Sequence, residues 1–385
     1  MNEDELRMLL GRVEAPPSRV DLAMVLREGQ RVARRRRYAV PGVAALTVLA
    51  LVAVPATIGA LRLRSHGSAG PRPSATPTGS TTPGVGAGCP YTLLPVPAGL
   101  TEARAEAVDP AGRYIAGWAL SKAGAITGLL WTDGRPQVLA GSTIGAINEH
   151  GVAVGIDRSG PFRYRDGQVT RLHLPAGYTA RGPLAINAAG DIITTASKYG
   201  GASQHGMIWP AGSDTARFLP TPLSAEVDGI DDDGTMVGLF NEPKGRWPVV
   251  WDKAGNMRRL ETPGPKVFGL AFSVRDGWAA GRLTGPDPAR PTSEKSWAAV
   301  WDVRTGKLVF KLSEADTATH VNSAGWFTAV RSAYDNHGQP VPLAAPAGYT
   351  VDASAITETN LVVGDWYVGG SSKPTTVIRP VTWQC

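Results

Sequence analysis

Cysteine is scarce in this chain, and the sequence motifs of common enzyme classes are missing from it. Only two of the 385 residues are cysteine, Cys89 and Cys385. This count excludes a zinc site of clustered thiolates and a small domain held together by many disulfides. The chain also lacks a Gly-x-Ser-x-Gly nucleophile elbow, a His-Glu-x-x-His zinc motif and a Gly-Lys-Ser/Thr phosphate loop. We therefore expect no cofactor and no metal site.

Most of the chain also carries no net charge. The formal charge of +6 reflects 39 Lys and Arg against 33 Asp and Glu. Residues 1–38 hold nine arginines and six acidic residues, and Arg62, Arg64 and Arg72 follow. What is left from Cys89 onward is 27 basic and 27 acidic residues. A neutral domain lacks the basic surface that nucleic acid requires, so no nucleic-acid partner is expected.

A turn motif, Ala-Ile-Asn-x-x-Gly-x-x-x-x-Gly or a degenerate copy of it, recurs seven times in the C-terminal three quarters of the chain. Its turn residues are Gly112, Gly151, Gly190, Gly234, Gly277, Gly325 and Asn360. Their successive spacings are 39, 39, 44, 43, 48 and 35 residues. A period near 40 with short apolar segments is the length of a four-stranded propeller blade. The sequence therefore predicts an all-β domain, a propeller of seven blades over residues 89–385.

The copy at residues 227–263 shows the expected strands most clearly. Four segments have the alternation and β-branched content of strands, namely 227–230, 235–240, 248–251 and 257–260. The turn Asp231-Asp232-Asp233-Gly234 has the composition of a polar hairpin, which we favour over a calcium site. The third strand of most copies ends in tryptophan, and we expect these side chains in the core: Trp131, Trp209, Trp251, Trp301 and Trp383.

The two ends of the repeat array predict how the ring closes. The seventh copy, residues 355–385, supplies three strands and ends without a fourth, whereas residues 91–95 have the pattern of the missing outer strand. Cys89 and Cys385 flank these two segments and lie outside the repeat, so we predict a disulfide between them; two unrelated buried thiols are the alternative. Closing so long a loop stabilises a fold by roughly 5 kcal/mol in the chain-entropy model. A disulfide also implies an oxidising compartment.

The N-terminal 88 residues predict a membrane anchor. Residues 39–61 are an uncharged apolar run of 23 residues, long enough for a transmembrane helix. Four arginines at 34–37 precede the run, so the positive-inside rule places residues 1–38 in the cytoplasm. Residues 62–88, rich in Ser, Thr, Pro, Gly and Ala, are typical of a flexible linker. We expect a plasma-membrane protein with an extracellular propeller; a cleaved signal peptide is the alternative.

The cytoplasmic segment 1–38 has short apolar faces of its own. Leu6, Leu9, Leu10 and Val13 form one of them, and a second follows a capping-box pattern at 18–21. Such faces suit either a cytoplasmic regulator or the inner leaflet of the membrane.

One stretch of the repeat carries a family resemblance. Ile147-Asn148-Glu149-His150-Gly151-Val152-Ala153-Val154-Gly155 resembles the HAF repeat of bacterial extracellular proteins, and the strand order is similar to kelch blades. The N-terminal part resembles uncharacterised single-pass membrane proteins of actinobacteria. The resemblance implies a propeller fold but no particular reaction or ligand. Copies five and six depart most from the motif: Phe272-Ser273-Val274 replaces Ile-Asn, and Tyr334-Asp335 stands where Trp is expected.

Variable connections between the repeated strands carry the candidate binding residues. Loops from the second to the third strand (B–C) and from the fourth strand to the next blade (D–A) share one face of a propeller, here called the B–C/D–A face. We assign to it Trp118, Tyr178, Arg181, Lys198, Tyr199, His205, Arg246, Arg331, Tyr334, Asp335, Tyr349 and Trp366. Aromatic and charged side chains on loops of a rigid scaffold suit sugar or peptide recognition.

Two functions fit this sequence. The first is a non-catalytic, monomeric binding or sensing module for a cell-wall glycan, peptide or protein partner. The alternative is an extracellular glycan hydrolase or lyase with dispersed carboxylates and His205 or His337 at the mouth of the axial channel. The enzyme requires a deep axial pocket with converging titratable groups, whereas a channel filled by apolar strand residues counts against it.

Overall fold

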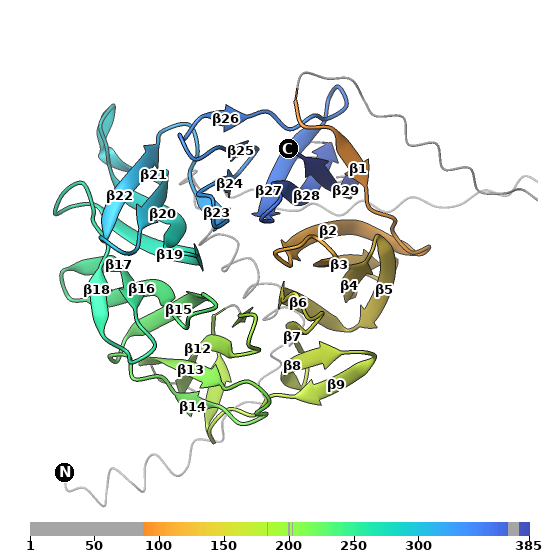
Figure 1. Ribbon diagram of the computed structural model, residues 1–385, viewed down its shortest axis with the longest axis horizontal. Coiled ribbons are helices and arrows are strands. Elements are labelled where there is room, and N and C mark those ends of the chain that lie inside the picture. Colours follow the sequence, from red (N-terminus) through yellow and green to blue (C-terminus); the bar gives the residue numbers. More distant parts are fainter. Residues whose placement is uncertain (1–87, 183, 199–200, 202, 369–376) are drawn as a thin grey trace, which may run out of the picture. The chain divides into compact units, whose positions relative to one another are not determined.

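Seven antiparallel sheets surround a central axis in the computed structural model (Figure 1). The model describes residues 88–182, 184–198, 201, 203–368 and 377–385. The predicted all-β, seven-bladed propeller is confirmed. The segments predicted at 1–38, 39–61 and, except for Gly88, 62–88 lie outside the described residues. Within the described part of the chain, no helix is long and apolar enough to span a membrane.

The first four blades take their strands in chain order. Blade 1 contains β2 (Leu100–Val108), β3 (Tyr114–Ser121), β4 (Ile126–Thr132) and β5 (Arg135–Ala140). Blade 2 contains β6 (Ser142–Ile147), β7 (Ala153–Asp157), β8 (Gly160–Arg165) and β9 (Gln168–Arg171). Blade 3 contains β10 (Tyr178–Ala180), β11 (Ala185–Ile186), β12 (Ile192–Lys198), β13 (Gln204–Trp209) and β14 (Arg217–Phe218). Blade 4 contains β15 (Ala225–Ile230), β16 (Met236–Glu242), β17 (Gly245–Trp251) and β18 (Met257–Arg259).

Blades 5 and 6 also take their strands in chain order, whereas blade 7 combines both ends of the domain. Blade 5 contains β19 (Phe268–Arg275), β20 (Trp278–Asp287), β21 (Arg290–Asp302) and β22 (Lys307–Leu312). Blade 6 contains β23 (Ala318–Val321), β24 (Phe327–Ala329), β25 (Ser332–Tyr334) and β26 (Pro340–Val341). Blade 7 contains β27 (Thr350–Ile356), β28 (Leu361–Val368), β29 (Val377–Gln384) and, as its outermost strand, β1 (Tyr91–Leu93).

Ring closure follows the prediction. Strand β1 pairs with β29 in the register Tyr91↔Trp383, so the first strand of the domain completes the last blade. Cys89 and Cys385 form a disulfide with their Cα atoms 4.9 Å apart, 296 residues apart in the sequence. The disulfide stands where the other blades have a turn between their third and fourth strands. It therefore joins two chain ends that would otherwise be free to separate.

A buried aromatic side chain near the end of each third strand packs every blade against its neighbours. The five predicted tryptophans are fully buried. Four of them donate from Nε1 to a carbonyl oxygen that follows the outer strand of the preceding blade, as Trp131 does to Pro95 at 2.7 Å and Trp383 to Ala344 at 2.7 Å. In blades 2 and 6 the position holds Tyr164 and Tyr334 instead, both buried. The repeated tryptophan is thus an inter-blade contact, as the sequence predicts.

The turn motif links the blades around the axis. Each blade's strands are called A to D from the axis outward, and the motif forms the turn from A to B. Its glycines have positive φ, for example 70° at Gly151, and Asn360, which replaces glycine, has φ 61°, a region that asparagine tolerates. The buried Asn148 accepts hydrogen bonds from two amides of its own turn and donates from Nδ2 to the carbonyl of Asn187 in the next blade, at 3.0 Å. The motif asparagine therefore fixes a turn and a blade interface at once.

Asn187 and Asn322 repeat this arrangement. Asn187 donates to the carbonyl of Asp231 at 3.3 Å, and Asn322 to that of Thr357 at 2.9 Å. At the joint between blades 7 and 1, the amide of Glu358 donates to the carbonyl of Pro110 at 3.0 Å. These bonds form a belt around the axial opening.

Removing one bond of this belt should destabilise the whole ring. We expect Asn148→Ala or Asn322→Ala to lower the free energy of unfolding by roughly 1–3 kcal/mol, because buried amide and carbonyl groups lose their partners. Urea unfolding followed by tryptophan fluorescence measures the loss. Asn256→Ala is the control, since Asn256 bonds only within its own exposed turn. Equal losses in control and test variants would rule out the inter-blade role.

Candidate functional site

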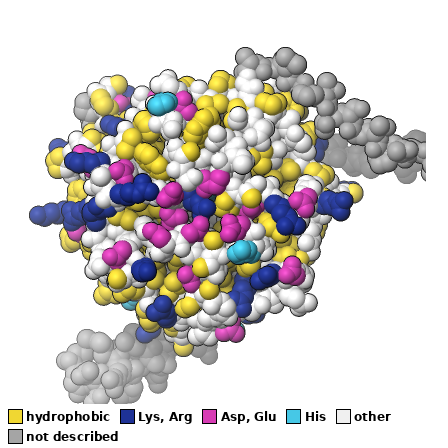
Figure 2. Space-filling view, in the orientation of Figure 1, with side chains coloured by type: hydrophobic (Ala, Val, Ile, Leu, Met, Phe, Trp, Pro, Cys, Tyr) yellow, Lys and Arg dark blue, Asp and Glu magenta, His cyan; other side chains and the backbone are white. Residues whose placement is uncertain are grey.

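The main cavity opens on the face that carries the A–B and C–D turns, here called the A–B/C–D face. Its volume is about 740 Å³. The A–B turns of blades 4, 5, 6 and 7 and the C–D turns of blades 4 and 5 supply most of its sixteen lining residues. We call this cavity the turn pocket. Figure 2 shows acidic side chains gathered near the centre of the ring, with basic ones beside them.

Charge is the main property of the turn pocket. Three arginines line it, Arg258, Arg275 and Arg304, against six acidic residues: Asp231, Asp232, Asp233, Asp252, Asp276 and Glu358. The lining is therefore net negative by three charges. None of its sixteen residues is aromatic.

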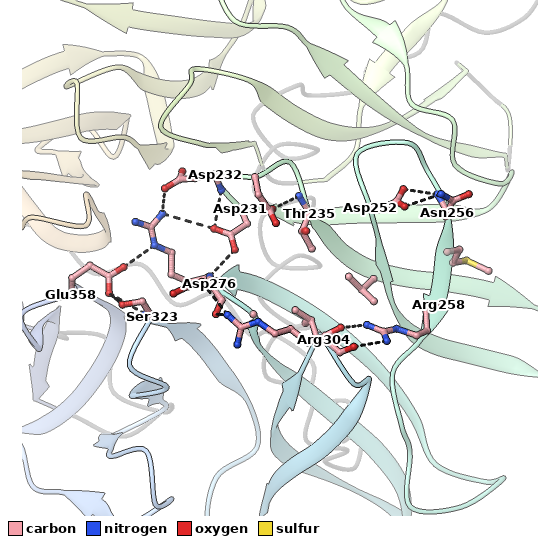
Figure 3. Close-up of a pocket in the computed structure, with 16 residues that line it drawn as sticks. Asp231, Asp232, Thr235, Asp252, Asn256, Arg258, Asp276, Arg304, Ser323 and Glu358 are labelled. Atoms are coloured by element: carbon pink, nitrogen blue, oxygen red, sulfur yellow. Dashed lines mark hydrogen bonds and ion pairs between the residues drawn. The ribbon is translucent and has the colours of Figure 1, made fainter.

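Arg275 bonds across the end of the turn pocket where Asp232 and Glu358 lie (Figure 3). It starts from blade 5, donates from Nε to Glu358 of blade 7 at 2.7 Å, and donates from Nη1 to Asp232 of blade 4. Asp231 lies 4.0 Å from the same Nη1 atom. The side chain of Arg275 is only 23% exposed. One cation thus connects three blades through three carboxylates.

The surrounding blades hold these carboxylates in place. Glu358 accepts from the amide of Ser323 at 3.0 Å and from its hydroxyl, while Asp232 accepts from the amide of Ala188 at 2.8 Å. Asp231 accepts from the amide of Asp276 at 2.6 Å and from the amide of Asp232 at 2.8 Å. Every oxygen of Asp231 and Glu358 therefore has a donor.

Burial and hydrogen bonding shift the carboxyl pKa values in opposite directions. Burial raises the pKa of Asp231 above its ordinary value, although the amides of Asp232 and Asp276 oppose the rise. Burial also acts to raise the pKa of Glu358, but the hydrogen bonds from Ser323 and Arg275 outweigh it and lower that pKa. Glu358 therefore stays ionised beside Arg275 at neutral pH.

The outer end of the turn pocket is more exposed. Arg304 donates to the carbonyl and the carboxylate of Asp276, at 2.8 and 3.1 Å. Arg258 donates to the carbonyls of Val303 and Arg304 in the next blade. Asp252 closes its own turn by accepting from Asn256. The side chain of Asp276 is 67% exposed, so this carboxylate is open to a ligand.

A second, smaller cavity lies on the axis beneath Arg275. Its volume is about 90 Å³. The ends of all seven A strands line it with the aliphatic side chains Val108, Ile147, Ile186, Ile230, Val274, Val321 and Ile356. Five ionisable residues line it as well: Glu149, Asp232, Arg275, His320 and Glu358. Such a space holds a few water molecules at most. Its volume is well below the roughly 300–1,000 Å³ of ordinary small-molecule sites.

His320 is the titratable group that sequence reasoning missed in this cavity. The residue is part-buried, yet its Nδ1 atom is shielded from solvent and has no hydrogen-bond partner among the described residues. Burial, together with the positive charge of Arg275, lowers the pKa of His320 to about 4. Its ring also donates to the backbone of Ile356. His320 is therefore neutral at pH 7, with Nδ1 as a free acceptor.

Four of the predicted binding residues come together on blade 3. Tyr178 makes an edge contact with His205 at 5.5 Å between ring centroids, and Phe218 contacts both rings. Lys198 pairs with Tyr178 across the sheet, and Arg181 donates to Ser197 at 2.7 Å. Tyr199 lies outside the described residues. This group lies away from the turn pocket.

Three more predicted residues are separated from this group. Trp118 donates to Glu106 at 2.8 Å and lies beside Arg104 at the joint of blades 1 and 7. Arg246 lies in β17 and pairs with Asn241 of β16, and Arg331 occupies the turn between β24 and β25 with φ 91°. The structure thus brings the twelve residues together only in part.

Three predictions about single residues need correction. Tyr334 and Trp366 were expected in loops but are 3% and 4% exposed. Tyr334 stacks on Phe327 at 5.1 Å in the slot where other blades carry tryptophan, and Trp366 packs between Tyr91 and Tyr349. The core needs the apolar area of these two side chains. Tyr349 lies in the D–A connection before β27, as predicted, and is partly buried against the same core.

Asp335 is on the opposite face from the one predicted. It lies in the turn between β25 and β26, where its carboxylate accepts from the amides of His337 and Gln339. The prediction failed because blade 6 has very short strands, so its turns could not be assigned from sequence.

The turn pocket was missed because its residues belong to the repeated turns, which the sequence explains as structure. One signal was present. Copy five departs from the motif, and there β19 runs to Arg275 before a two-residue turn, Asp276-Gly277. Within the described ranges, no group of three or more His, Cys, Asp or Glu is arranged to hold a metal ion.

The neutral state of His320 predicts how stability depends on pH. The unfolded chain takes up this proton near the ordinary pKa of 6.5, and the folded chain only near 4. Between these values the unfolded state binds more protons, so stability falls as the pH is lowered. We expect His320→Asn to flatten this part of the curve in urea unfolding at successive pH values. His150→Asn, at an exposed turn of the same face, should leave the slope unchanged; an identical effect of both variants would refute the assignment.

Comparison with known proteins supports the fold and gives no family. No protein-family model and no curated protein matches the chain, so its resemblance to HAF and kelch repeats stays a prediction. The fold is similar to that of oligogalacturonate lyase from Vibrio parahaemolyticus, with a TM-score of 0.55 and 9% identity over 76% of this chain and 93% of that chain. It is also similar to an oligogalacturonate lyase in complex with manganese, with a TM-score of 0.54 and 10% identity over 78% of this chain and 94% of that chain. At such identities the similarity shows the fold alone.

Proposed function

We propose that this protein is a non-catalytic binding module and that its turn pocket binds a cationic segment of a peptide or protein partner. The observation that carries the proposal is a preformed cavity of about 740 Å³ whose lining has a net charge of −3. Such a surface attracts positively charged groups and raises their local concentration. Because the turns belong to a closed ring, little ordering is needed on binding.

The state of the carboxylates argues against catalysis. A general acid or base must be within reach of a substrate proton. Three lining carboxyls have shifted pKa values, those of Asp231, Asp252 and Glu358, and every oxygen of the three already accepts a hydrogen bond from the protein. These carboxyls therefore do not offer the free acid–base pair that the alternative function, a glycan hydrolase or lyase, would need in the turn pocket. Similarity in fold to oligogalacturonate lyases does not by itself transfer their activity.

The lining also favours a peptide over a glycan. Sugar rings commonly stack on aromatic side chains, and none of the sixteen lining residues is aromatic. Carboxylates pair instead with the ammonium or guanidinium groups of lysine and arginine. The exposed oxygens of Asp233 and Asp276 are the contacts we assign to such a ligand.

The proposal includes the location of the module. The arginines at 34–37 and the apolar run 39–61 support a single-pass anchor, and the disulfide supports an oxidising compartment outside the membrane. The propeller would then meet partners in the cell wall, and segment 1–38 would meet a cytoplasmic regulator.

Binding should depend on exposed acidic residues of the turn pocket. We expect the full-length protein to bind a fluorescent oligolysine or oligoarginine peptide more tightly than an oligoglutamate peptide of equal length, and less tightly as salt is added. Asp233→Asn with Asp276→Asn should weaken binding by about two- to tenfold, since exposed charge pairs contribute about 0.2–1 kcal/mol each. Asn is chosen because it tolerates the positive φ of Asp276.

A matched control is available on another blade. Asp166 has the same kind of exposed turn position, with φ 48°, but lies in blade 2 outside the pocket. Asp166→Asn should leave affinity unchanged. If both sets of variants lose affinity equally, or if no cationic peptide binds, the proposed function is wrong.

The topology is tested separately. Protease added to intact cells should remove the propeller and spare an epitope placed within residues 1–38, because the membrane protects only the cytoplasmic side. Recovery of a soluble mature form beginning near residue 57 would instead establish the signal-peptide alternative.

A further inference from the structure

Arg275 occupies its place because blade 5 departs from the repeat. The residue after the motif position is Pro110, Glu149, Ala188, Asp232, Ser323 or Glu358 in the other six blades. None of these is basic. In blade 5 the A strand extends to this point, and Arg275 pairs directly with Trp278 across a two-residue turn. The arginine is therefore directed over the axial opening from the end of a rigid strand.

The carboxylates around this guanidinium do not rely on it for their positions. Asp232 is fixed by the amide of Ala188 in blade 3, and Glu358 by the amide and hydroxyl of Ser323 in blade 6. Asp231 is fixed by two amides. Since these donors belong to the turns and the belt, the three carboxylates should keep their arrangement when the Arg275 side chain is removed.

The axial cavity borders two of the same carboxylates. Asp232, Arg275, Glu358 and His320 all line this cavity of about 90 Å³. The shielded Nδ1 atom of His320 has no hydrogen-bond partner in the described part of the chain. A guanidinium group offers five N–H donors in a plane, whereas an ammonium offers three around a point. Arg275 itself donates from Nε to Glu358 and from Nη1 to Asp232, so two carboxylates on opposite sides match a planar group better than a point charge.

We infer that the axial mouth is a guanidinium-binding site, that Arg275 fills it in the free protein, and that an arginine side chain of a bound ligand competes with Arg275 for it. The second part rests on the proposed function, because it requires a cationic ligand in the turn pocket. The first part concerns the chain alone. A ligand therefore has to displace Arg275 from this site. An arginine side chain should do so more readily than a lysine side chain, because it presents the same planar group.

Chemical rescue tests the site. Arg275→Ala in the full-length protein should lower the melting temperature, because three carboxylates then face one another without a cation. Methylguanidinium should restore the melting temperature in a saturable way, with a dissociation constant in the millimolar range, and methylammonium should restore it much less. Wild-type protein should show no such stabilisation, since its site is filled.

Two variants control for general effects of the added salt. Arg113→Ala removes an exposed arginine, paired with Asp133, just after the A–B turn of blade 1, and should show no rescue. Glu358→Gln combined with Arg275→Ala should abolish rescue. If Arg275→Ala does not fold, Arg275→Gln keeps the stem of the side chain and is tested in the same way. Equal stabilisation by methylguanidinium and methylammonium, or rescue of Arg113→Ala, would overturn the inference.

Peptide binding separates this inference from the proposed function. Arg275→Ala should bind an oligoarginine peptide about tenfold more tightly than wild type does, with a smaller gain for oligolysine. Rescue by methylguanidinium without peptide binding to any variant would support the site and reject the proposed function. Peptide binding without rescue would support the function and reject the site.

Discussion

Closure of the ring is the constraint on which the rest of this structure depends. Each blade buries its faces against two neighbours, so an open array would leave two large apolar faces exposed. The chain avoids this by building blade 7 from both of its ends, with β1 paired to β29. The Cys89–Cys385 disulfide joins these ends where no turn can. Because the sheets are packed in a closed circle, residues that are more than a hundred positions apart in sequence, such as Arg104 and Asp365, meet at 2.9 Å.

The A–B turns have two tasks that use the same atoms. Their asparagine and aspartate side chains bind backbone groups of their own turn and of the next blade, which sets the distance between blades at the axis. The same turns line the turn pocket. A site made from structural turns is rigid. Its carboxylates Asp231 and Glu358 already accept hydrogen bonds, whereas Asp233 and Asp276 stay exposed, which suits recognition of a cation better than proton transfer. Function is therefore carried by departures from the repeat, such as Arg275, more than by the repeat itself.

The expected binding face and the observed pocket lie on opposite sides of the ring. Residues on variable connections, such as Tyr178 and His205, were selected because the repeat did not explain them. The turn pocket was overlooked for the converse reason: Asp231 and Asp232 looked sufficiently explained by a hairpin. A position that varies between copies of the repeat is one that the fold does not constrain. A cavity forms only where several turns surround a common space. That property is not visible within any single copy.

The sequence by itself determined the blade count, the strand order, the core tryptophans and the pairing of the two cysteines. The first three follow from local alternation, from turn residues that require positive φ and from the period between them. The cysteine pairing follows from the position of Cys89 and Cys385 at the two ends of the repeat array. Only the tertiary structure decided which side chains share a space. Arg275, Asp232 and Glu358 come from three different blades, and Trp366 is buried by aromatic residues from both ends of the domain. The physical reason is that the ring angle between blades sets these contacts, and it depends on packing between sheets, which no local pattern encodes.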